Sequence, residues 1–442
     1  MPIIQSVDGC MDAAIGNCGL SPAALDARLD ALGAAITHLK AQYEVASLPL
    51  LHVAEQTQSL KNASAALDRL SAGARTLVFF GTGGSSLGGQ AIAQLGGWFI
   101  PGDQKRAQGL RPRTRFYDNL DPRTLETTLA GLDLENARFI IISKSGNTPE
   151  TLVQALAALQ VVKDAGLGDR IPDLFLGLTE PASQNANGLR QVCNDYGIEI
   201  LDHDPGIGGR FAALTNVGLL PALSRGLDAP ALLKGAGDVV AQLLSAKDAS
   251  DFAPAIGAAA AVALTEERGA RIHVLMPYSD RLERFADWYV QLAGESLGKQ
   301  GRGFTPVAAL GPVDQHSQLQ LYLDGPRDHF ITILRTGCSG SGPKISQDMA
   351  EAAGAGYLAG RTAGDLVAAQ QQAIPQALMD ASRPVRTLDV DQLDEHALGS
   401  LMMHFMLETI LAAHLLKVDP FDQPAVEAGK VLTRQRLDRA NG

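Results

Sequence analysis

Residues 76–89 read TLVFFGTGGSSLGG, and this stretch gives the strongest indication of the fold. Its first five residues form a short apolar run that ends at Gly81, which is typical of a buried strand running directly into a turn. A glycine-rich turn that opens a helix leaves backbone N–H groups free at the positive end of the helix dipole, where a phosphate binds well. We therefore expect this turn, with its glycines and serines, to form a phosphate site. A tight strand-to-helix turn without a ligand would use glycines in the same way.

Two familiar phosphate loops do not match this turn. A dinucleotide-binding fingerprint needs a glycine where Ser86 stands, and a P-loop needs a Gly-Lys-Ser/Thr ending that the stretch lacks. The turn therefore predicts a different kind of phosphate site.

Further strand-like runs alternate with helical stretches along the chain. Strands are expected at residues 76–80, 138–143, 173–178 and 197–201, and, beyond the helical stretch 229–245, at residues 271–276 and 330–334. This alternation predicts an α/β protein with mainly parallel sheets that are covered by helices on both faces. We expect a helical N-terminal arm (residues 1–45), two α/β domains (46–225 and 226–385) and a C-terminal helical segment (386–442).

A second polar loop, SKSGNTPET, follows the strand expected at 138–143. Thr148 and Pro149 suit the N-cap and first position of a helix, so a second helix N-terminus is expected at the same edge of the sheet. Ligands of open α/β sheets bind outside the carboxyl ends of the strands. Ser143, Lys144 and Ser145, together with Thr148, offer hydroxyl groups and a cation that match a phosphate dianion.

Two further segments carry candidate charged groups. Arg210 follows the glycine turn at 206–209, where a fixed guanidinium could stabilise negative charge on a reacting oxygen or simply form a surface ion pair. Gln291 and Glu295 are four residues apart and therefore lie on one face of an expected helix. Lys299 lies four residues beyond Glu295, and an exposed Glu–Lys pair is the commoner cause of that spacing.

A single histidine and the C-terminal tail complete the candidates. His316 lies in the polar loop GPVDQHSQ, and a loop histidine can act as a general acid or base near neutral pH. The tail reads DPFDQPAVEAGK from residue 419, with Gln423 before an expected helix and Lys430 about two turns into it. Taken alone, Lys430 looks like a surface lysine.

Composition restricts the class of protein. The chain has 442 residues, 46% hydrophobic and 19% charged, and a formal net charge of −11, which argues against a nucleic-acid-binding or anionic-membrane-binding surface. No apolar run reaches the roughly 18 residues of a membrane span. Its four cysteines form no CxxC pair, so neither a zinc site nor a disulfide framework is expected. The first twenty residues do not resemble a secretory signal, which favours a cytoplasmic location.

Six ordered blocks of this sequence together closely resemble the glucose-6-phosphate isomerase (phosphoglucose isomerase) family in its compact bacterial form. They are GTGGSSLGG at 81, SKSGNTPET at 143, GIGGRFAALTNVGLLPA at 206, QLAGESLGKQG at 291, GPVDQHSQLQLYLDGP at 311 and DPFDQPAVEAGK at 419. The first two blocks mark the broader sugar-isomerase (SIS) domain, whereas the last three, in this order, are specific to the family. The resemblance implies two SIS-type αβα sandwich domains.

The resemblance also implies roles for individual residues. Glu295 corresponds to the catalytic base, His316 and Lys430 to the ring-opening groups, and Arg210 to the arginine that stabilises the intermediate. The implied substrate- and phosphate-binding residues are Gly84, Ser85, Ser143, Lys144, Ser145, Thr148, Gln291 and Gln423. In the family the histidine reaches the neighbouring subunit's site and meets a glutamate, here Glu150, which implies a homodimer. No metal or cofactor is implied.

The function implied is the reversible isomerisation of glucose 6-phosphate to fructose 6-phosphate through a cis-enediolate. Two alternatives are a non-catalytic phosphosugar-binding regulator with the same domains and an isomerase that also accepts mannose 6-phosphate. A regulator would not need Glu295, His316 and Lys430 together. Thr82 and Ala212 depart from residues common in the family, at positions that flank the expected site.

Overall fold

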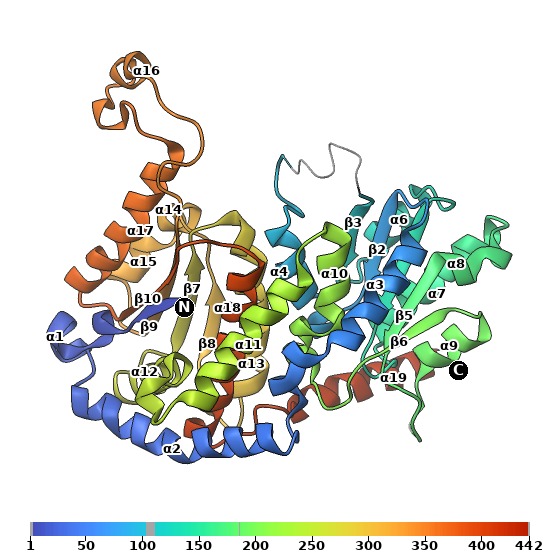
Figure 1. Cartoon of the computed structure of the whole chain (residues 1–442), viewed down its shortest axis with the longest axis horizontal. Helices are drawn as coiled ribbons and strands as arrows, with labels where there is room; N and C mark the ends of the chain where they lie inside the picture. Colours follow the sequence, from blue (N-terminus) through green and yellow to red (C-terminus); the bar gives the residue numbers. More distant parts are fainter. Residues whose placement is uncertain (1–2, 103–110, 185, 441–442) are drawn as a thin grey trace.

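The computed structural model describes residues 3–102, 111–184 and 186–440. These residues form two five-stranded sheets that lie side by side, with helices between them and on their outer faces (Figure 1). In spatial order the first sheet contains β3 (Arg113–Tyr117), β2 (Thr76–Phe80), β4 (Ala137–Ile142), β5 (Phe175–Thr179) and β6 (Glu199–Asp202). The second contains β1 (Ile4–Ser6), β10 (Val385–Val390), β9 (His329–Thr336), β7 (Ile272–Pro277) and β8 (Thr305–Ala308). The expected α/β class is confirmed.

The first sheet is parallel throughout and buried on both faces. Along β2, Leu77 and Phe79 pack into the core shared with the central helices, whereas Val78 and Phe80 pack under the outer helices. Because both faces are covered, the strand is a continuous apolar run. The strand expected at 76–80 has those bounds. Strand β3 was not expected from the sequence and lies at the edge of this sheet. Its sequence, RTRFY, contains charged residues, which prevent edge strands from pairing with further strands.

Two strands of the second sheet, β1 and β10, come from the N-terminal arm and from the start of the C-terminal segment, where no strand was expected. Strand β10 runs parallel to β9, and β1 pairs antiparallel with β10, with Ile4 opposite Asp389. The N-terminal arm is therefore helical only after β1, and the boundary expected at 385/386 falls inside β10. A three-residue strand such as β1 has too few positions for its periodicity to be recognised.

Helices form three layers around the two sheets. The central layer contains α4 (Leu87–Leu95), α10 (Asn216–Arg225), α11 (Ala229–Ser245), α13 (Glu283–Leu297) and α18 (Glu395–Leu416). The outer face of the first sheet is covered by α6 (Pro122–Ala130), α7 (Pro149–Asp164), α8 (Ile171–Leu174) and α9 (Gly188–Asp195), and that of the second by α15 (Leu319–Asp324) and α17 (Ala363–Asp380). The central layer also packs against α2 (Pro22–Glu44), α3 (Thr57–Ser71) and α12 (Ala253–Glu267).

Helix α18 is the most apolar long helix of the described chain. Its length and hydropathy would allow it to cross a membrane, but 89% of the relevant window is buried inside the protein. It packs against α11, α12 and α13, and it contains Glu408 at a buried position. Helix α18 is therefore a core helix of the central layer and not a surface or membrane helix in this structure.

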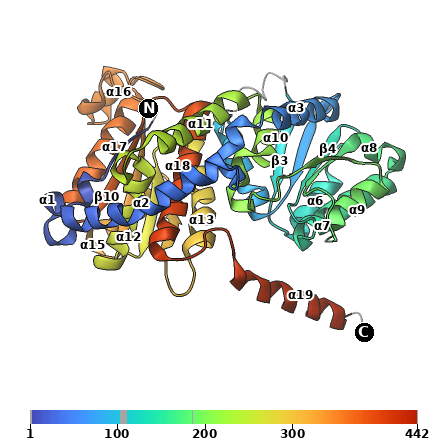
Figure 2. The ribbon, with the colours of Figure 1, turned by 60° about the horizontal axis from the view of Figure 1, so that its bottom comes forward.

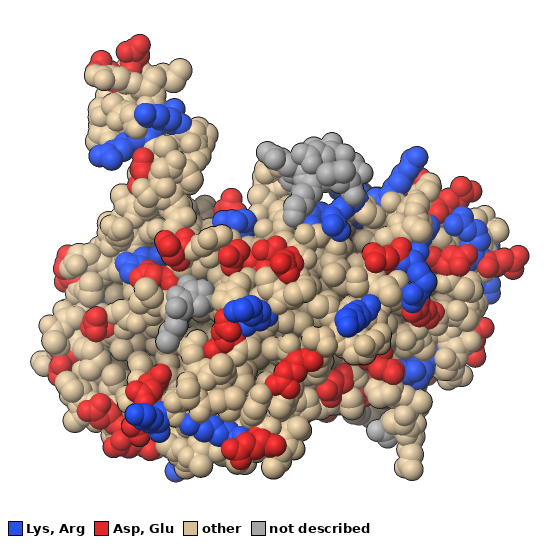
Figure 3. All heavy atoms as spheres, in the orientation of Figure 1, with Lys and Arg blue, Asp and Glu red and all other residues tan. Residues whose placement is uncertain are grey.

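Two segments project from this body. The excursion that carries α16 (Gln347–Ala352) extends from the second sheet, and α19 (Glu427–Ala440) leaves the body after residue 423 (Figures 1 and 2). On the face drawn in Figure 3, acidic and basic side chains are interspersed, without one broad basic surface. This charge pattern gives no support to a nucleic-acid-binding role on that face.

A buried histidine in the second sheet provides a test of acid stability. His273 Nε2 lies 2.9 Å from Thr265 Oγ1 and 3.1 Å from Ala270 O, and its ring stacks on Phe304. Burial lowers the pKa of His273 from 6.5 to about 3, opposed in part by the hydrogen bond to Ala270. The native state therefore keeps this ring neutral at pH values where the unfolded chain protonates it.

We expect this histidine to make the protein less stable as the pH falls from about 6.5 towards 3. The unfolded state binds the proton in this window and the native state does not, so the contribution changes by up to about 1.4 kcal/mol per pH unit. The measurement compares the free energy of unfolding of the wild type and His273→Gln in urea at several pH values. Parallel pH profiles for the two proteins would contradict the assignment.

Candidate active site

The glycine-rich turn after β2, residues 81–86, lies where the other candidate segments meet. A Cβ atom added at Gly81 would lie 3.2 Å from the carbonyl oxygen of Ile142, the last residue of β4. One added at Gly84 would lie 2.3 Å from the carbonyl carbon of Gly209. A side chain is excluded at Gly84 by this close approach to Gly209, and at Gly81 by the carbonyl oxygen of Ser85, 2.8 Å from the added Cβ. The first turn therefore contacts both the end of β4 and the turn that precedes Arg210.

The second polar loop follows β4 at the same edge of the sheet. Ser143 Oγ donates a hydrogen bond to Thr148 Oγ1 at 3.2 Å, and Ser145 Oγ accepts one from the backbone N–H of Asn147 at 3.3 Å. Thr148 is the N-cap residue of α7 and Pro149 its first residue, as expected, although the Thr148 side chain forms no capping bond. Its oxygen serves the loop instead. Lys144 Nζ donates to the carbonyl oxygen of Pro205 at 3.0 Å.

Helix α13 brings Gln291 and Glu295 next to the first turn. Gln291 Nε2 donates to Glu295 Oε1 at 2.9 Å, so the two side chains share one helical face as expected. A Cβ atom at Gly83, where φ is +58°, would lie 3.0 Å from Gln291 Nε2. Gln291 Oε1 is buried without a hydrogen-bond partner. An unpaired acceptor next to this turn is available to a ligand hydroxyl group.

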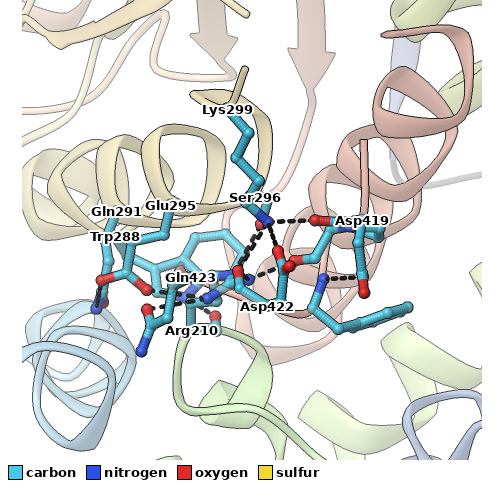
Figure 4. A network of polar contacts seen from close by, with 11 residues as sticks. Arg210, Trp288, Gln291, Glu295, Ser296, Lys299, Asp419, Asp422 and Gln423 are labelled. Carbon is cyan, nitrogen blue, oxygen red and sulfur yellow. Dashed lines mark hydrogen bonds and ion pairs between the residues drawn. The ribbon is translucent and has the colours of Figure 1, made fainter. Parts of the chain in front are cut away.

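Arg210 lies at the centre of the polar cluster (Figure 4). Its Nη1 donates to Glu295 Oε2 and to Gln423 Oε1, both at 3.2 Å, and its Nε donates to Ser296 Oγ at 2.8 Å. The Arg210 side chain is only 4% exposed, whereas Glu295 is 32% exposed. Burial lowers the pKa of Arg210 and the Glu295 carboxylate opposes that shift, so the guanidinium remains a cation.

Glu295 pairs with Arg210 and not with Lys299. Its ion-pair partner is Arg210, and Lys299 forms an ion pair with Asp422 instead, at 2.6 Å. The Glu295–Lys299 pair favoured by spacing alone is therefore wrong. The carboxylate is half-exposed beside a fixed cation, an arrangement that suits proton transfer next to a developing oxyanion.

Sequence reasoning missed two residues that hold Arg210. Ser296 accepts from its Nε, and Trp288 Nε1 donates to the carbonyl oxygen of Arg210 at 3.2 Å. Both are buried on α13, one residue after and seven residues before Glu295. Their helix was predicted, but no sequence pattern indicates which of its side chains reaches a loop in the other half of the molecule.

The remaining candidates lie outside this cluster in the single chain. His316 is exposed on the short helix α14 (Val313–Ser317), and Glu150 is exposed in the first turn of α7. Lys430 lies on the projecting helix α19, where its Nζ donates to Glu427 Oε1 at 2.6 Å. The structure therefore brings together Glu295, Arg210, both glutamines and the loops after β2 and β4, but neither His316 nor Lys430.

A family comparison agrees with this arrangement. A family model described as phosphoglucose isomerase matches residues 71–441, which include every segment of the cluster. The chain belongs to the phosphoglucose isomerase family. Among its relatives in that family, the glucose-6-phosphate isomerase of Rubrobacter xylanophilus is 38% identical over 367 residues, covering 83% of each chain.

Two solved structures share the fold of this phosphoglucose isomerase family member. A hypothetical protein from Thermus thermophilus superposes with a TM-score of 0.81 at 31% identity, covering 94% of this chain and 98% of the other. A glucose-6-phosphate isomerase from Chlamydia trachomatis gives a TM-score of 0.72 at 23% identity, covering 87% and 74%. The second likeness shows the fold alone. Together with the two mainly parallel sheets, it confirms the expected fold class.

Proposed function

We propose that the chain interconverts glucose 6-phosphate and fructose 6-phosphate, in glycolysis and gluconeogenesis, in the cytoplasm. Membership of the phosphoglucose isomerase family supports this function. The observation that carries it is the pair formed by the half-exposed Glu295 carboxylate and the buried Arg210 guanidinium, 3.2 Å apart and next to the glycine-rich turn. A sugar phosphate held by the loops would present its reacting carbons to this pair.

Glu295 is the proposed base. It removes the proton from C2 of the open-chain aldose as the C1 carbonyl becomes an enediolate oxygen, and it returns the proton to C1 as the C2 oxygen becomes the carbonyl. The hydroxyl proton moves from O2 to O1, so atoms and charge balance and no oxidant is required. Arg210 stabilises the negative charge on the enediolate. The Gln291 amide holds Oε1 of the carboxylate and so orients the base.

The proposed phosphate site consists of the two loops after β2 and β4. Backbone N–H groups near Gly84, the hydroxyls of Ser85, Ser143, Ser145 and Thr148, and Lys144 would hold the dianion. Helix α7 begins at Pro149 and is 16 residues long, so its N-terminus adds a partial positive charge at this edge. The site therefore relies on local donors, which is compatible with a net charge of −11.

Ring opening is proposed to require a second subunit. His316 is exposed near Val313 and Leu321, which are exposed apolar residues, and Glu150 is exposed near the exposed Val153 and Leu156. Two patches of this kind suit burial against each other in a homodimer. The His316 of one chain would then meet Glu150 of the other and open the sugar ring together with Lys430.

Mixing two inactive variants tests the shared site. We expect His316→Ala chains and Glu295→Gln chains to recover activity together, because each heterodimer contains one site with both groups intact. With random exchange the mixture should reach about a quarter of wild-type activity. Glu295→Gln mixed with Arg210→Met is the control, since both groups come from one chain and no site is restored. No recovery despite demonstrated subunit exchange would contradict donation of His316.

The function itself is tested by supplying fructose 6-phosphate to the purified chain. A coupling dehydrogenase detects the glucose 6-phosphate that is formed. Turnover is expected with the purified chain. A phosphosugar-binding regulator would bind fructose 6-phosphate without turnover, and this outcome would contradict the proposal. Parallel assays with mannose 6-phosphate show whether the site also accepts the C2 epimer.

A further inference from the structure

The segment of residues 419–423 crosses the active-site cluster between α18 and α19. We call it the strap. It carries Gln423, whose Oε1 accepts from Arg210 Nη1 (Figure 4). It also carries Phe421, whose ring packs on Phe211 with centroids 5.3 Å apart. Because the strap has no regular secondary structure before residue 424, side chains from the body must fix its position.

Lys299 directs its ammonium group to the strap. Its ammonium group has three N–H donors, and these contact the carbonyl oxygen of Asp419, the carbonyl oxygen of Asp422 at 2.7 Å and Asp422 Oδ1 at 2.6 Å. The Lys299 side chain is only 10% exposed. A buried ammonium whose three donors all bind one segment serves that segment, and is not a solvated surface charge.

Lys299 and Arg210 share an acceptor. The carbonyl oxygen of Asp422 accepts from Lys299 Nζ at 2.7 Å and from Arg210 Nη2 at 2.8 Å. Arg210 Nη2 also donates to the carbonyl oxygen of Pro420. A displacement of the strap would therefore remove acceptors from the same guanidinium that faces the catalytic carboxylate.

All five N–H donors of Arg210 have acceptors, so the guanidinium has little freedom to move. They bind Ser296, Glu295, Gln423, Pro420 and Asp422, and three of these five partners belong to the strap. The strap therefore sets the plane of the guanidinium relative to Glu295. Without Lys299, the Asp422 carboxylate would lose its ion pair, and the strap would be held mainly by the arginine that it positions.

We propose that Lys299 is a positioning residue that anchors the strap and thereby orients Arg210 and Gln423 at the reacting atoms. This inference rests on the proposed isomerase function. The donors of Lys299 are occupied by the strap. Its loss should therefore affect the chemical step more than binding of the phosphate at the loops after β2 and β4.

The test compares the wild type, Lys299→Met, Lys299→Arg and the control Lys234→Met. Lys234 is an exposed lysine that pairs with Asp238 one turn away, so its loss should change nothing. For Lys299→Met we expect kcat to fall about 100-fold with little change in KM, because misplacement of a reacting group by about 1 Å has such an effect. Lys299→Arg keeps the charge and should recover much of the rate.

A structural readout accompanies the kinetics. Chymotrypsin cleavage after Phe421 reports strap opening, and we expect it to be faster in Lys299→Met while the melting temperature stays near that of the wild type. The proposal is overturned if kcat stays within about twofold of wild type, if cleavage is unchanged, or if Lys299→Arg gives no recovery. If the wild type lacks isomerase activity, the proposed function fails, whereas the cleavage rates still report whether Lys299 anchors the strap.

Discussion

Glu295→Gln is expected to lower kcat about 10²–10⁴-fold, the range contributed by a positioned general base. Glutamine keeps the shape of the side chain but cannot accept the proton from carbon. Arg210 would retain Ser296, Gln423 and the strap carbonyls, so the site should remain folded. Titration calorimetry with fructose 6-phosphate should therefore show binding close to that of the wild type.

Isotope exchange makes this prediction specific to proton transfer. In deuterated water the wild type should place deuterium at C2 of glucose 6-phosphate, because the carboxylate exchanges its proton with solvent during turnover. Glu295→Gln should lose exchange and isomerisation together. The control is Glu199→Gln, which removes an exposed carboxylate paired with Arg69 at 2.5 Å. Exchange that persists in Glu295→Gln would show that another group is the base.

Arg386→Met is expected to have the largest effect on stability, a loss of roughly 3–5 kcal/mol in the free energy of unfolding. Arg386 Nη1 contacts both carboxylate oxygens of Glu408 at 2.8 Å, and the two side chains are 1% and 7% exposed. His404 Nε2 lies 3.2 Å from Glu408 Oε2. Removing the guanidinium leaves the Glu408 carboxylate buried between the second sheet and α18 without its main partner.

Urea unfolding followed by fluorescence of the buried Trp288 measures this loss. The double variant Arg386→Met with Glu408→Leu should recover much of the stability, because replacing both charges with apolar groups removes the unpaired carboxylate. Arg69→Met is the surface control, and we expect it to cost no more than about 1 kcal/mol. A loss for Arg386→Met no larger than that of Arg69→Met would contradict the importance of the buried pair.

The parts of the site that could be predicted are local in sequence. The turn at 81–86 directly follows a continuous apolar run, and Gln291 and Glu295 are one helical turn apart, so an apolar run and a period of about 3.6 residues are sufficient to place them. The polar loop marked His316 as a possible general acid or base, but its ring-opening role and any role of Lys430 came only from the family resemblance. The single chain leaves both outside the cluster around Arg210.

Neighbouring residues alone specify the α/β class, the glycine turns at the strand ends and the helical face shared by Gln291 and Glu295, so these features can be predicted from the sequence. Which charges pair depends instead on the packing of distant segments. Glu295 binds Arg210, 85 residues away, and Lys299 binds the carbonyl of Asp422, 123 residues away. An exposed Glu–Lys pair one turn apart gains only a few tenths of a kcal/mol. The packing of distant segments therefore determines the partners of Glu295 and Lys299, and the small gain from a pair between these two residues does not.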